Sequence, residues 1–412
     1  MKIAIITSGF LPVVDGVTVG TYYRLKKLSQ WGHQVLLFCP DYQALKSIYP
    51  EWKQYTGEIL PGVRVINLES TPFMGLNFER NVSYRSYKIV LNELETFAPD
   101  IIHVEEPERL FVGFFRVPGV RFAQQHNIPC VACFRTNFLE YADDFFEFPT
   151  VVIKLIQSVF KVLLRFVYNS YNMTLVPSRI TQKKLASFGI KNSQYTDLNG
   201  FEESKYKCIE KDQFFFEKNY KIKNIENKIK LIFVGRLTPD KGWKFTLDVY
   251  PKVLQQIDPE KIALIIVGDG SMATEIAQTF SRITPHAYLL GRVSPDQIPA
   301  LLMNSDIYIT TSEKENRAVT LIEAFAAALP VLAPRAGGLV QDIQDGKNGY
   351  LFEPQNQEDF ILKLKKLVEN DSLRQEMGSE AKKYISQYTW EQTVKNLQQE
   401  WQQQIQKKLK SS

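Results

Sequence analysis

Cysteine is scarce in this chain, which holds only four among its 412 residues. Cys39, Cys130, Cys133 and Cys208 are too few to form a disulfide framework and do not have the spacing of a zinc site. Cys130 and Cys133 form a C-x-x-C pair, but they lie inside an apolar run, and we interpret them as buried thiols of a strand. No redox or metal chemistry is therefore assigned to cysteine.

A large excess of charge of one sign is also absent. Fifty Lys and Arg side chains stand against 45 Asp and Glu, giving a net charge of +5. This balance is too even to indicate nucleic acid as the main partner, although a mildly basic protein can still rest on an anionic membrane. The first six residues run directly into a strand pattern, without the apolar core and cleavage site of a signal peptide. We expect a cytoplasmic protein, at most peripheral on the inner face of a membrane.

Short, continuous apolar runs alternate with longer helical stretches along the whole chain. Such runs are typical of parallel strands that helices cover on both faces. The first set of runs covers residues 2–9, 34–39, 63–68, 101–104, 128–134 and 173–176. The second set covers residues 229–234, 262–267, 287–290, 306–310 and 330–333. The predicted fold is α/β, with two Rossmann-like, doubly wound parallel-sheet domains that face a cleft.

These sets divide the chain into four parts. Residues 1–200 form the first Rossmann-like domain, 201–228 a polar connector rich in Lys, Glu and Asn, and 229–385 the second Rossmann-like domain. Residues 386–412 form a terminal helix, which we expect to pack back on the first domain. In open parallel sheets ligands bind at the carboxyl ends of strands, so candidate site residues are sought there.

Glycines and cations follow several of the predicted strands. Gly16 lies in a loop that opens a helix, where backbone N–H groups can approach an anion, although a plain loop is an equal interpretation. Arg236 and Lys241 follow residues 229–234 and suit a diphosphate whose charge grows as a bond to it breaks; the alternative is two surface cations. Gly268 permits close packing or ligand approach.

The most specific pattern lies between residues 312 and 325. Glu315 falls in a turn, and a helix should begin near Ala318, so the amides of Ala318, Val319 and Thr320 are candidate phosphate donors. Glu323 follows about one turn later. The two carboxylates suit sugar and ribose hydroxyls. An acidic helix start would explain Glu315, but it explains Glu323 less well because apolar residues follow it directly.

These motifs resemble those of the GT-B retaining glycosyltransferases of family 4. In chain order they are FLP at 10–12 with DG at 15–16, PDIIH at 99–103, LVPS at 175–178, GR at 235–236 with KG at 241–242, GDG at 268–270, the Glu-x7-Glu pair at 315 and 323 with AFAAALPV at 324–331, and RAGG at 335–338. The resemblance spans nearly the whole chain. Within it, the segment from 312 to 338 and the loop at 15–16 look most like those of sulfolipid synthases and related glycosyltransferases that act on diacylglycerol or other lipid acceptors.

The resemblance implies a role for each matching residue. By this resemblance, Arg236 and Lys241 contact the donor diphosphate, Glu315 contacts the donor hexose, and Glu323 contacts the ribose. Gly16 approaches the phosphates from the first domain, and the backbone near Arg292 and Val293 holds the base. The resemblance also places Gly268, Ala318, Val319 and Thr320 in the donor site. It also implies retention at the anomeric carbon without a covalent intermediate. No metal or other cofactor is expected beside the nucleotide sugar, because the sequence has no D-x-D motif and the Asp pair at 143–144 is remote from these motifs.

One position departs from the family pattern. Relatives usually carry a histidine near the donor sugar after the fifth strand, where this chain has Arg135. A guanidinium stays charged and cannot carry the proton. Either the leaving phosphate takes the acceptor proton, or Arg135 pairs with an anionic group such as a uronate or sulfonate on the donor sugar. Ala318, where the family often has glycine, is a milder departure.

Residues 145–171 are apolar but interrupted by Lys154, Lys161 and Arg165. Three cations argue against a membrane-spanning helix. Their spacing gives one basic stripe, which suits an interfacial helix or an ordinary helix packed on the first sheet. We expect a glycosyltransferase that moves a sugar from a nucleoside diphosphate, with UDP favoured, to a lipid acceptor. A soluble or polysaccharide acceptor, or nucleotide-sugar binding without catalysis, are the alternatives.

Overall fold

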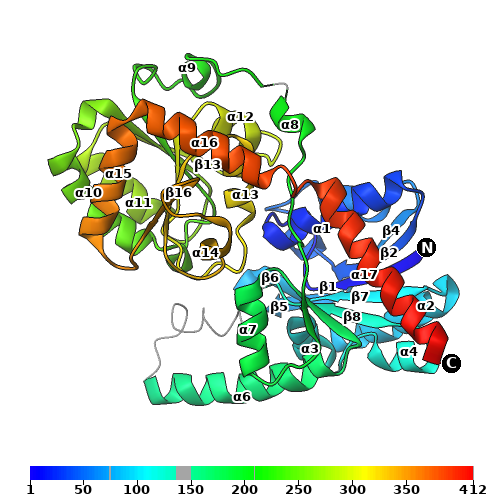
Figure 1. Cartoon of the computed structure of the whole chain (residues 1–412). Coiled ribbons are helices and arrows are strands. Elements are labelled where there is room, and N and C mark those ends of the chain that lie inside the picture. The colour runs from blue at the N-terminus through cyan, green and yellow to red at the C-terminus, as the bar shows by residue number, and fades with distance from the viewer. Residues whose placement is uncertain (74–75, 136–149, 208, 412) are drawn as a thin grey trace. The chain divides into compact units, whose positions relative to one another are not determined.

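The computed structural model describes residues 1–73, 76–135, 150–207 and 209–411. They form two compact units (Figure 1). Unit 1 holds the described residues of Met1–Leu139, Phe148–Asn199 and Trp390–Ser412, and unit 2 those of Gly200–Thr389. Cys208, the Asp pair at 143–144 and the first part of the apolar segment at 145–171 lie outside the described residues.

Unit 1 is built on an eight-stranded sheet in the order β10-β9-β8-β7-β1-β2-β4-β3, in which only β3 and β4 pair antiparallel. Its strands are β1 (Lys2–Thr7), β2 (Gln34–Pro40), β3 (Gly57–Leu60), β4 (Val63–Leu68), β7 (Ile101–Glu105), β8 (Cys130–Cys133), β9 (Met173–Val176) and β10 (Ser193–Tyr195). A separate antiparallel hairpin joins β5 (Ser70–Phe73) to β6 (Leu76–Val82). The six predicted strands are confirmed; the antiparallel edge, the hairpin and β10 were not predicted.

Helices cover both faces of this sheet. On one face pack α1 (Gly16–Gln30) and α17 (Trp390–Ser411), which bury Leu25, Leu28, Val394, Leu397 and Trp401 against the strands. On the other pack α2 (Tyr87–Phe97), α3 (Pro107–Phe114), α4 (Val120–Gln125), α6 (Thr150–Asn169) and α7 (Arg179–Ser187). The continuous apolar runs of the strands thus reflect burial on two sides.

Unit 2 has a fully parallel six-stranded sheet in the order β13-β12-β11-β14-β15-β16. Its strands are β11 (Ile229–Val234), β12 (Ile262–Val267), β13 (Ala287–Gly291), β14 (Ile307–Ile309), β15 (Val331–Pro334) and β16 (Gly349–Phe352). One face is covered by α10 (Trp243–Gln256), α11 (Ala273–Ile283) and α15 (Gln357–Glu369). The other is covered by α12 (Ile298–Met303), α13 (Val319–Ala326), the short α14 (Leu339–Asp342) and α16 (Asp371–Ile385).

The polar stretch at 201–228 packs with unit 2. It contains α8 (Ser204–Lys207) and α9 (Phe215–Tyr220), and it buries Phe201, Tyr206 and Phe216 in the core of that unit. Both units are therefore Rossmann-like parallel-sheet folds. In each sheet the strand order reverses once, between β1 and β7 in unit 1 and between β11 and β14 in unit 2. Such reversal points are where open parallel sheets bind ligands.

Candidate functional site

The predicted residues of the second half all follow neighbouring strands of unit 2. Arg236 and Lys241 follow β11, Gly268 follows β12, and Glu315 follows β14. Because the strands are parallel, these segments share one edge of the sheet. The β11 and β14 ends lie on the two sides of the point where the strand order reverses. The structure therefore brings the cations and Glu315 to the place where the fold favours a ligand.

A buried carboxylate, Asp240, holds both cations. Arg236 Nη2 lies 3.0 Å and Lys241 Nζ 3.8 Å from Asp240 Oδ2. The hydroxyl of Thr238 donates to Asp240 Oδ1, and the Asp240 side chain is fully buried. A buried charge needs such partners, so Asp240 fixes where the two cations stand. Sequence reasoning missed Asp240; its place between two predicted cations was the available signal.

Lys241 also reaches across to the loop after β14. Its Nζ lies 2.7 Å from Glu315 Oε1, and about a fifth of each side chain is exposed. Half of the Arg236 side chain is exposed. The cluster thus presents two positive side chains and one carboxylate on a partly open surface. A diphosphate suits the cations, and a sugar hydroxyl suits the carboxylate.

The loop that carries Glu315 is supported by the glycines after β15. Gly338 N–H donates to Glu315 O at 2.6 Å. A Cβ atom at Gly338 would collide with the carbonyl oxygen of Asn316, so no larger residue fits without moving this loop. The Arg-Ala-Gly-Gly motif therefore positions the Glu315 loop, a role that sequence spacing did not indicate.

Helix α13 begins beside this loop. Ala318 is its N-cap, and no side chain caps the helix, so its first N–H groups lack the usual side-chain acceptor. Val319 is the first helical residue, and Thr320 Oγ1 accepts a hydrogen bond from Tyr308 at 2.7 Å. Glu323 is half-buried, and burial raises its pKa to about 7. The helix N-terminus is thus suited to an anion.

Gly268 and Val293 occupy more distant places along the same edge. A Cβ atom at Gly268 would collide with the carbonyl oxygen of Gly235, which explains why the β12 end requires glycine. Val293 follows β13, is half-buried, and packs against the core of unit 2. Since β13 lies two strands from β11, Val293 lies apart from the Lys241 and Glu315 cluster.

In unit 1 the structure brings Gly16 and Arg135 together. Gly16 opens α1, but the N-cap Asp15 already accepts hydrogen bonds from two N–H groups of the first turn. Arg135 is buried, with 8% of its surface exposed. It donates to Gly16 O at 3.1 Å, to Leu198 O at 3.3 Å and to Asn199 Oδ1 at 2.8 Å. Its guanidinium therefore holds the start of α1 against the segment where the chain leaves unit 1.

A pair of residues at the β1/β7 reversal point was missed from the sequence. The Ser8 hydroxyl, after β1, donates to Glu106 Oε2, after β7. Glu106 has a left-handed backbone (φ 51°), which is unusual for a residue with a side chain. Tyr168 donates to Glu108 Oε2, and burial, followed by the charge of Glu106, raises the pKa of Glu108 to about 8. Only the strand order places Ser8 and Glu106 at the reversal point, where open parallel sheets bind ligands.

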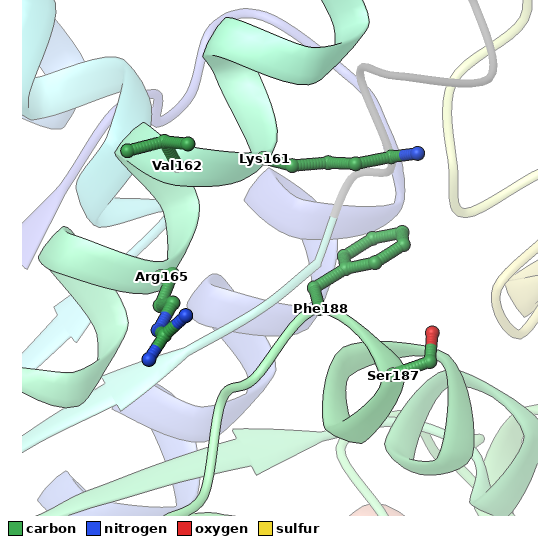
Figure 2. A pocket seen from close by; sticks show the side chains of 5 residues that line it. All are labelled: Lys161, Val162, Arg165, Ser187 and Phe188. Atoms are coloured by element: carbon green, nitrogen blue, oxygen red, sulfur yellow. The ribbon is translucent and has the colours of Figure 1, made fainter.

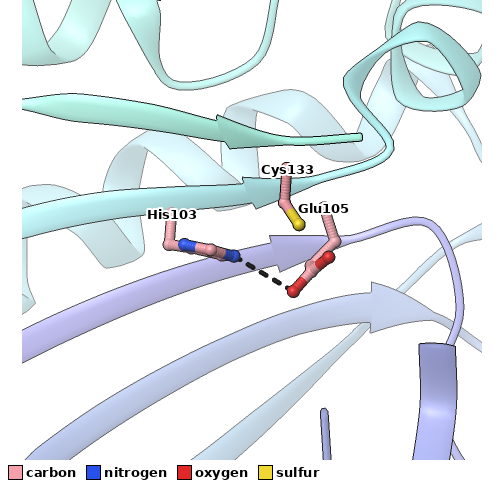
Figure 3. Close-up of side chains that lie close together, drawn as sticks. All are labelled: His103, Glu105 and Cys133. Atoms are coloured by element: carbon pink, nitrogen blue, oxygen red, sulfur yellow. Dashed lines mark hydrogen bonds and ion pairs between the residues drawn. The ribbon is translucent and has the colours of Figure 1, made fainter. Parts of the chain in front are cut away.

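Among the described residues, the side chains of His103, Glu105 and Cys133 lie close enough together to hold a metal ion (Figure 3). All three are buried, and His103 Nε2 lies 3.0 Å from Glu105 Oε1. The chemistry does not fit a cation, because the buried Arg24 guanidinium already pairs with Glu105. Trp401 Nε1 donates to His103 Nδ1 at 3.2 Å. The network instead ties α17 to β7.

Two family profiles match consecutive parts of the chain. The profile described as Glycosyltransferase Family 4 matches residues 14–196, and that described as Glycosyl transferases group 1 matches residues 215–384. A crystal structure of Anabaena Alr3699/HepE in complex with UDP and glucose has a TM-score of 0.71 over all of both chains, at 19% identity.

Curated relatives are similar at low identity. Sulfoquinovosyl transferase SQD2 of Arabidopsis thaliana is 26% identical over 73% of this chain, although the match spans only 56% of that protein. A GDP-mannose-dependent alpha-mannosyltransferase of Corynebacterium glutamicum is 25% identical over 95% of this chain and 86% of its own. Alpha-monoglucosyldiacylglycerol synthase of Streptococcus pneumoniae is 22% identical over 83% and 74%.

Proposed function

The chain belongs to the GT-B glycosyltransferases, with a family 4 domain followed by a group 1 domain, and we propose that it transfers a hexosyl group from UDP-sugar to a lipid acceptor such as diacylglycerol. The transfer proceeds with retention and without a metal ion. The observation that carries the donor half is the contact of Lys241 with Glu315 across the reversal point of unit 2, with the uncapped start of α13 beside it.

In this proposal the diphosphate lies against Arg236, Lys241 and the first N–H groups of α13. Glu315 accepts hydrogen bonds from the hexose, and Glu323 accepts them from the ribose. The acceptor oxygen forms a bond to the anomeric carbon while the bond from that carbon to the diphosphate oxygen breaks. The acceptor proton passes to the departing diphosphate, whose growing charge the two cations stabilise. The cations take the part that a divalent ion has in other transferases.

A lipid acceptor is supported by the name of one relative, the monoglucosyldiacylglycerol synthase. The mannosyltransferase relative supports a second candidate, a GDP-mannose donor. Melting temperatures of the full chain with UDP-glucose, UDP-galactose, UDP-glucuronate, UDP-sulfoquinovose and GDP-mannose decide between donors, because a ligand that binds the folded form raises its melting point. We expect UDP-sugars to give the larger shifts, and a shift with GDP-mannose alone contradicts the UDP assignment.

Transfer is tested with the preferred donor and diacylglycerol in mixed vesicles. We expect a glycolipid product that retains the anomeric configuration and forms equally in the presence of EDTA. Donor hydrolysis without transfer to lipid, together with transfer to a soluble glycan, would assign a different acceptor. Absence of both hydrolysis and transfer would reduce the function to nucleotide-sugar binding.

Arg135 remains a proposed contact for an anionic donor sugar, but its three hydrogen bonds within unit 1 favour a positioning role. A comparison of two variants separates the positioning role of Arg135 from a contact with the donor sugar. If Arg135 positions α1, Arg135→Ala and Asn199→Ala lower kcat similarly for neutral and charged UDP-sugars. If Arg135 binds a sugar anion, only Arg135→Ala raises KM, and only for charged donors.

A further inference from the structure

Helix α6 exposes a stripe of large apolar side chains. Leu155, Val159, Val162 and Phe166 are 65%, 63%, 69% and 58% exposed. Their spacing of four, three and four residues places them on one face of the helix. The core face of α6 is a different one, because Leu164, Val167 and Tyr168 are buried against the sheet. Large apolar side chains gathered on one exposed face mark a surface that binds something.

The charge around this stripe has one sign only. From Thr150 to Thr196 the chain contains no Asp or Glu, and it has seven cations. These cations are Lys154, Lys161, Arg165, Arg179, Lys183, Lys184 and Lys191. The remaining 43 basic and all 45 acidic side chains leave the rest of the chain slightly acidic. The stripe therefore lies in the basic part of a molecule whose charge is segregated along the chain.

A shallow pocket of about 330 Å³ lies where α6 meets the end of α7 (Figure 2). It is lined by Lys161, Val162, Arg165, Ser187 and Phe188. Lys161 Nζ lies 5.3 Å from the centre of the Phe188 ring. Within the described part of the chain, neither Lys161 nor Arg165 pairs with a carboxylate. Since Val162 belongs to both the pocket and the stripe, cationic and apolar contacts adjoin.

We propose that this face of α6 and α7 is a docking surface for an anionic lipid bilayer. The stripe enters the boundary between head groups and acyl chains, and Lys161 and Arg165 bind lipid phosphates. Among the described residues, no helix has the length and apolar character of a membrane span. A second copy of the chain suits the face poorly, because two surfaces with cations alone repel each other.

The surface would present unit 1 to the lipid acceptor, and in that respect it rests on the proposed function. The experiment measures binding of the chain to vesicles rather than enzymatic turnover. Flotation of the full chain with vesicles of phosphatidylglycerol and phosphatidylcholine is compared with flotation on phosphatidylcholine alone. We expect binding to the anionic vesicles that is at least about tenfold tighter and that salt weakens.

Two variants locate the surface. Val159→Glu with Val162→Glu, and Lys161→Gln with Arg165→Gln, should each lower vesicle affinity about tenfold or more. Leu362→Glu, at an exposed apolar position of α15 in unit 2, is the matched control and should bind as the unmodified chain does. Donor hydrolysis in solution should stay unchanged in all of them, which shows that they fold.

Three results would overturn the proposal. They are equal binding by the stripe variants and the unmodified chain, absence of binding to anionic vesicles, and self-association that the stripe variants abolish. Vesicle binding without sugar transfer to lipid would leave the surface intact and refute the lipid acceptor. The two proposals thus fail separately.

Discussion

At the scale of single residues, the sequence indicated the ionic groups better than their partners. Lys241 and Glu315 were expected near a donor, and the structure brings them to 2.7 Å. Asp240 was not expected although it lies between two predicted cations, because sequence spacing does not show that its side chain is buried. The bond between Ser8 and Glu106 was missed for a related reason, since it depends on the order of strands β1 and β7.

The raised pKa of Glu323 predicts pH-dependent donor binding. Burial raises this pKa to about 7, so the carboxylate that we propose as the acceptor for ribose hydroxyls becomes protonated as the pH falls below 7. Affinity for UDP should therefore fall by up to about fivefold between pH 7 and pH 6, since the ionised fraction falls from about one half to about one tenth. Calorimetric titration of UDP into the chain at pH 6, 7 and 8 measures this change in affinity. Glu323→Gln removes the contribution of this carboxylate, so the pH dependence that the variant retains measures the titration of UDP itself. Equal pH dependence of UDP affinity in the variant and the unmodified chain would refute the proposed role of Glu323.

Glu108 predicts a pH dependence of stability in unit 1. Its pKa is raised to about 8, so between its ordinary value and pH 8 the folded chain retains a proton that the unfolded chain releases. This lowers the free energy of unfolding by up to about 1.4 kcal/mol per pH unit as the pH rises. Glu108→Gln should therefore gain melting temperature relative to the unmodified chain from pH 5 to pH 8.

The exposed Glu58→Gln is the control for that experiment, because its side chain lies in solvent on the edge strand β3. It should show no such trend. A constant difference between Glu108→Gln and the unmodified chain across this range would mean that Glu108 ionises normally when folded.

At the scale of elements, long apolar runs were the predictable part. Residues 63–68 and 229–234 were predicted as strands and coincide with β4 and β11. The β5–β6 hairpin and β16 were missed because they are short or mix polar and apolar residues, which gives no clear period. One face of helix α6 packs on the sheet, as predicted for an ordinary helix, and another face is exposed.

The support of the Glu315 loop by Gly338 can be tested by one methyl group. In Gly338→Ala the Cβ atom collides with the carbonyl oxygen of Asn316, so the loop must move. We expect a loss of about 1–3 kcal/mol in stability and weaker UDP-sugar binding. Lys347→Ala, exposed in the following loop, should change neither. Unchanged donor affinity in Gly338→Ala would show that the loop does not depend on this glycine.

At the scale of the whole molecule, two Rossmann-like units carry different charges and different surfaces. Unit 2 concentrates the cations, carboxylates and helix start suited to a nucleotide sugar. Unit 1 carries the basic, apolar face of α6 and α7 and the carboxyl groups at its reversal point. The two-domain organisation followed from the repeated strand pattern. The strand orders that select one reversal point in each unit required the structure.

We propose that Arg236 and Lys241 hold the donor diphosphate without a metal ion. Calorimetric titration of UDP into the full chain tests it, with the Arg236→Ala/Lys241→Ala double variant, Lys244→Ala as a control at an exposed position of α10, and EDTA present or absent. We expect about a 100-fold or greater loss of affinity in the double variant, since charge-assisted contacts contribute about 1.5–3 kcal/mol each. Neither Lys244→Ala nor EDTA should change the affinity. Unchanged affinity in the double variant, or loss of binding with EDTA, would contradict it.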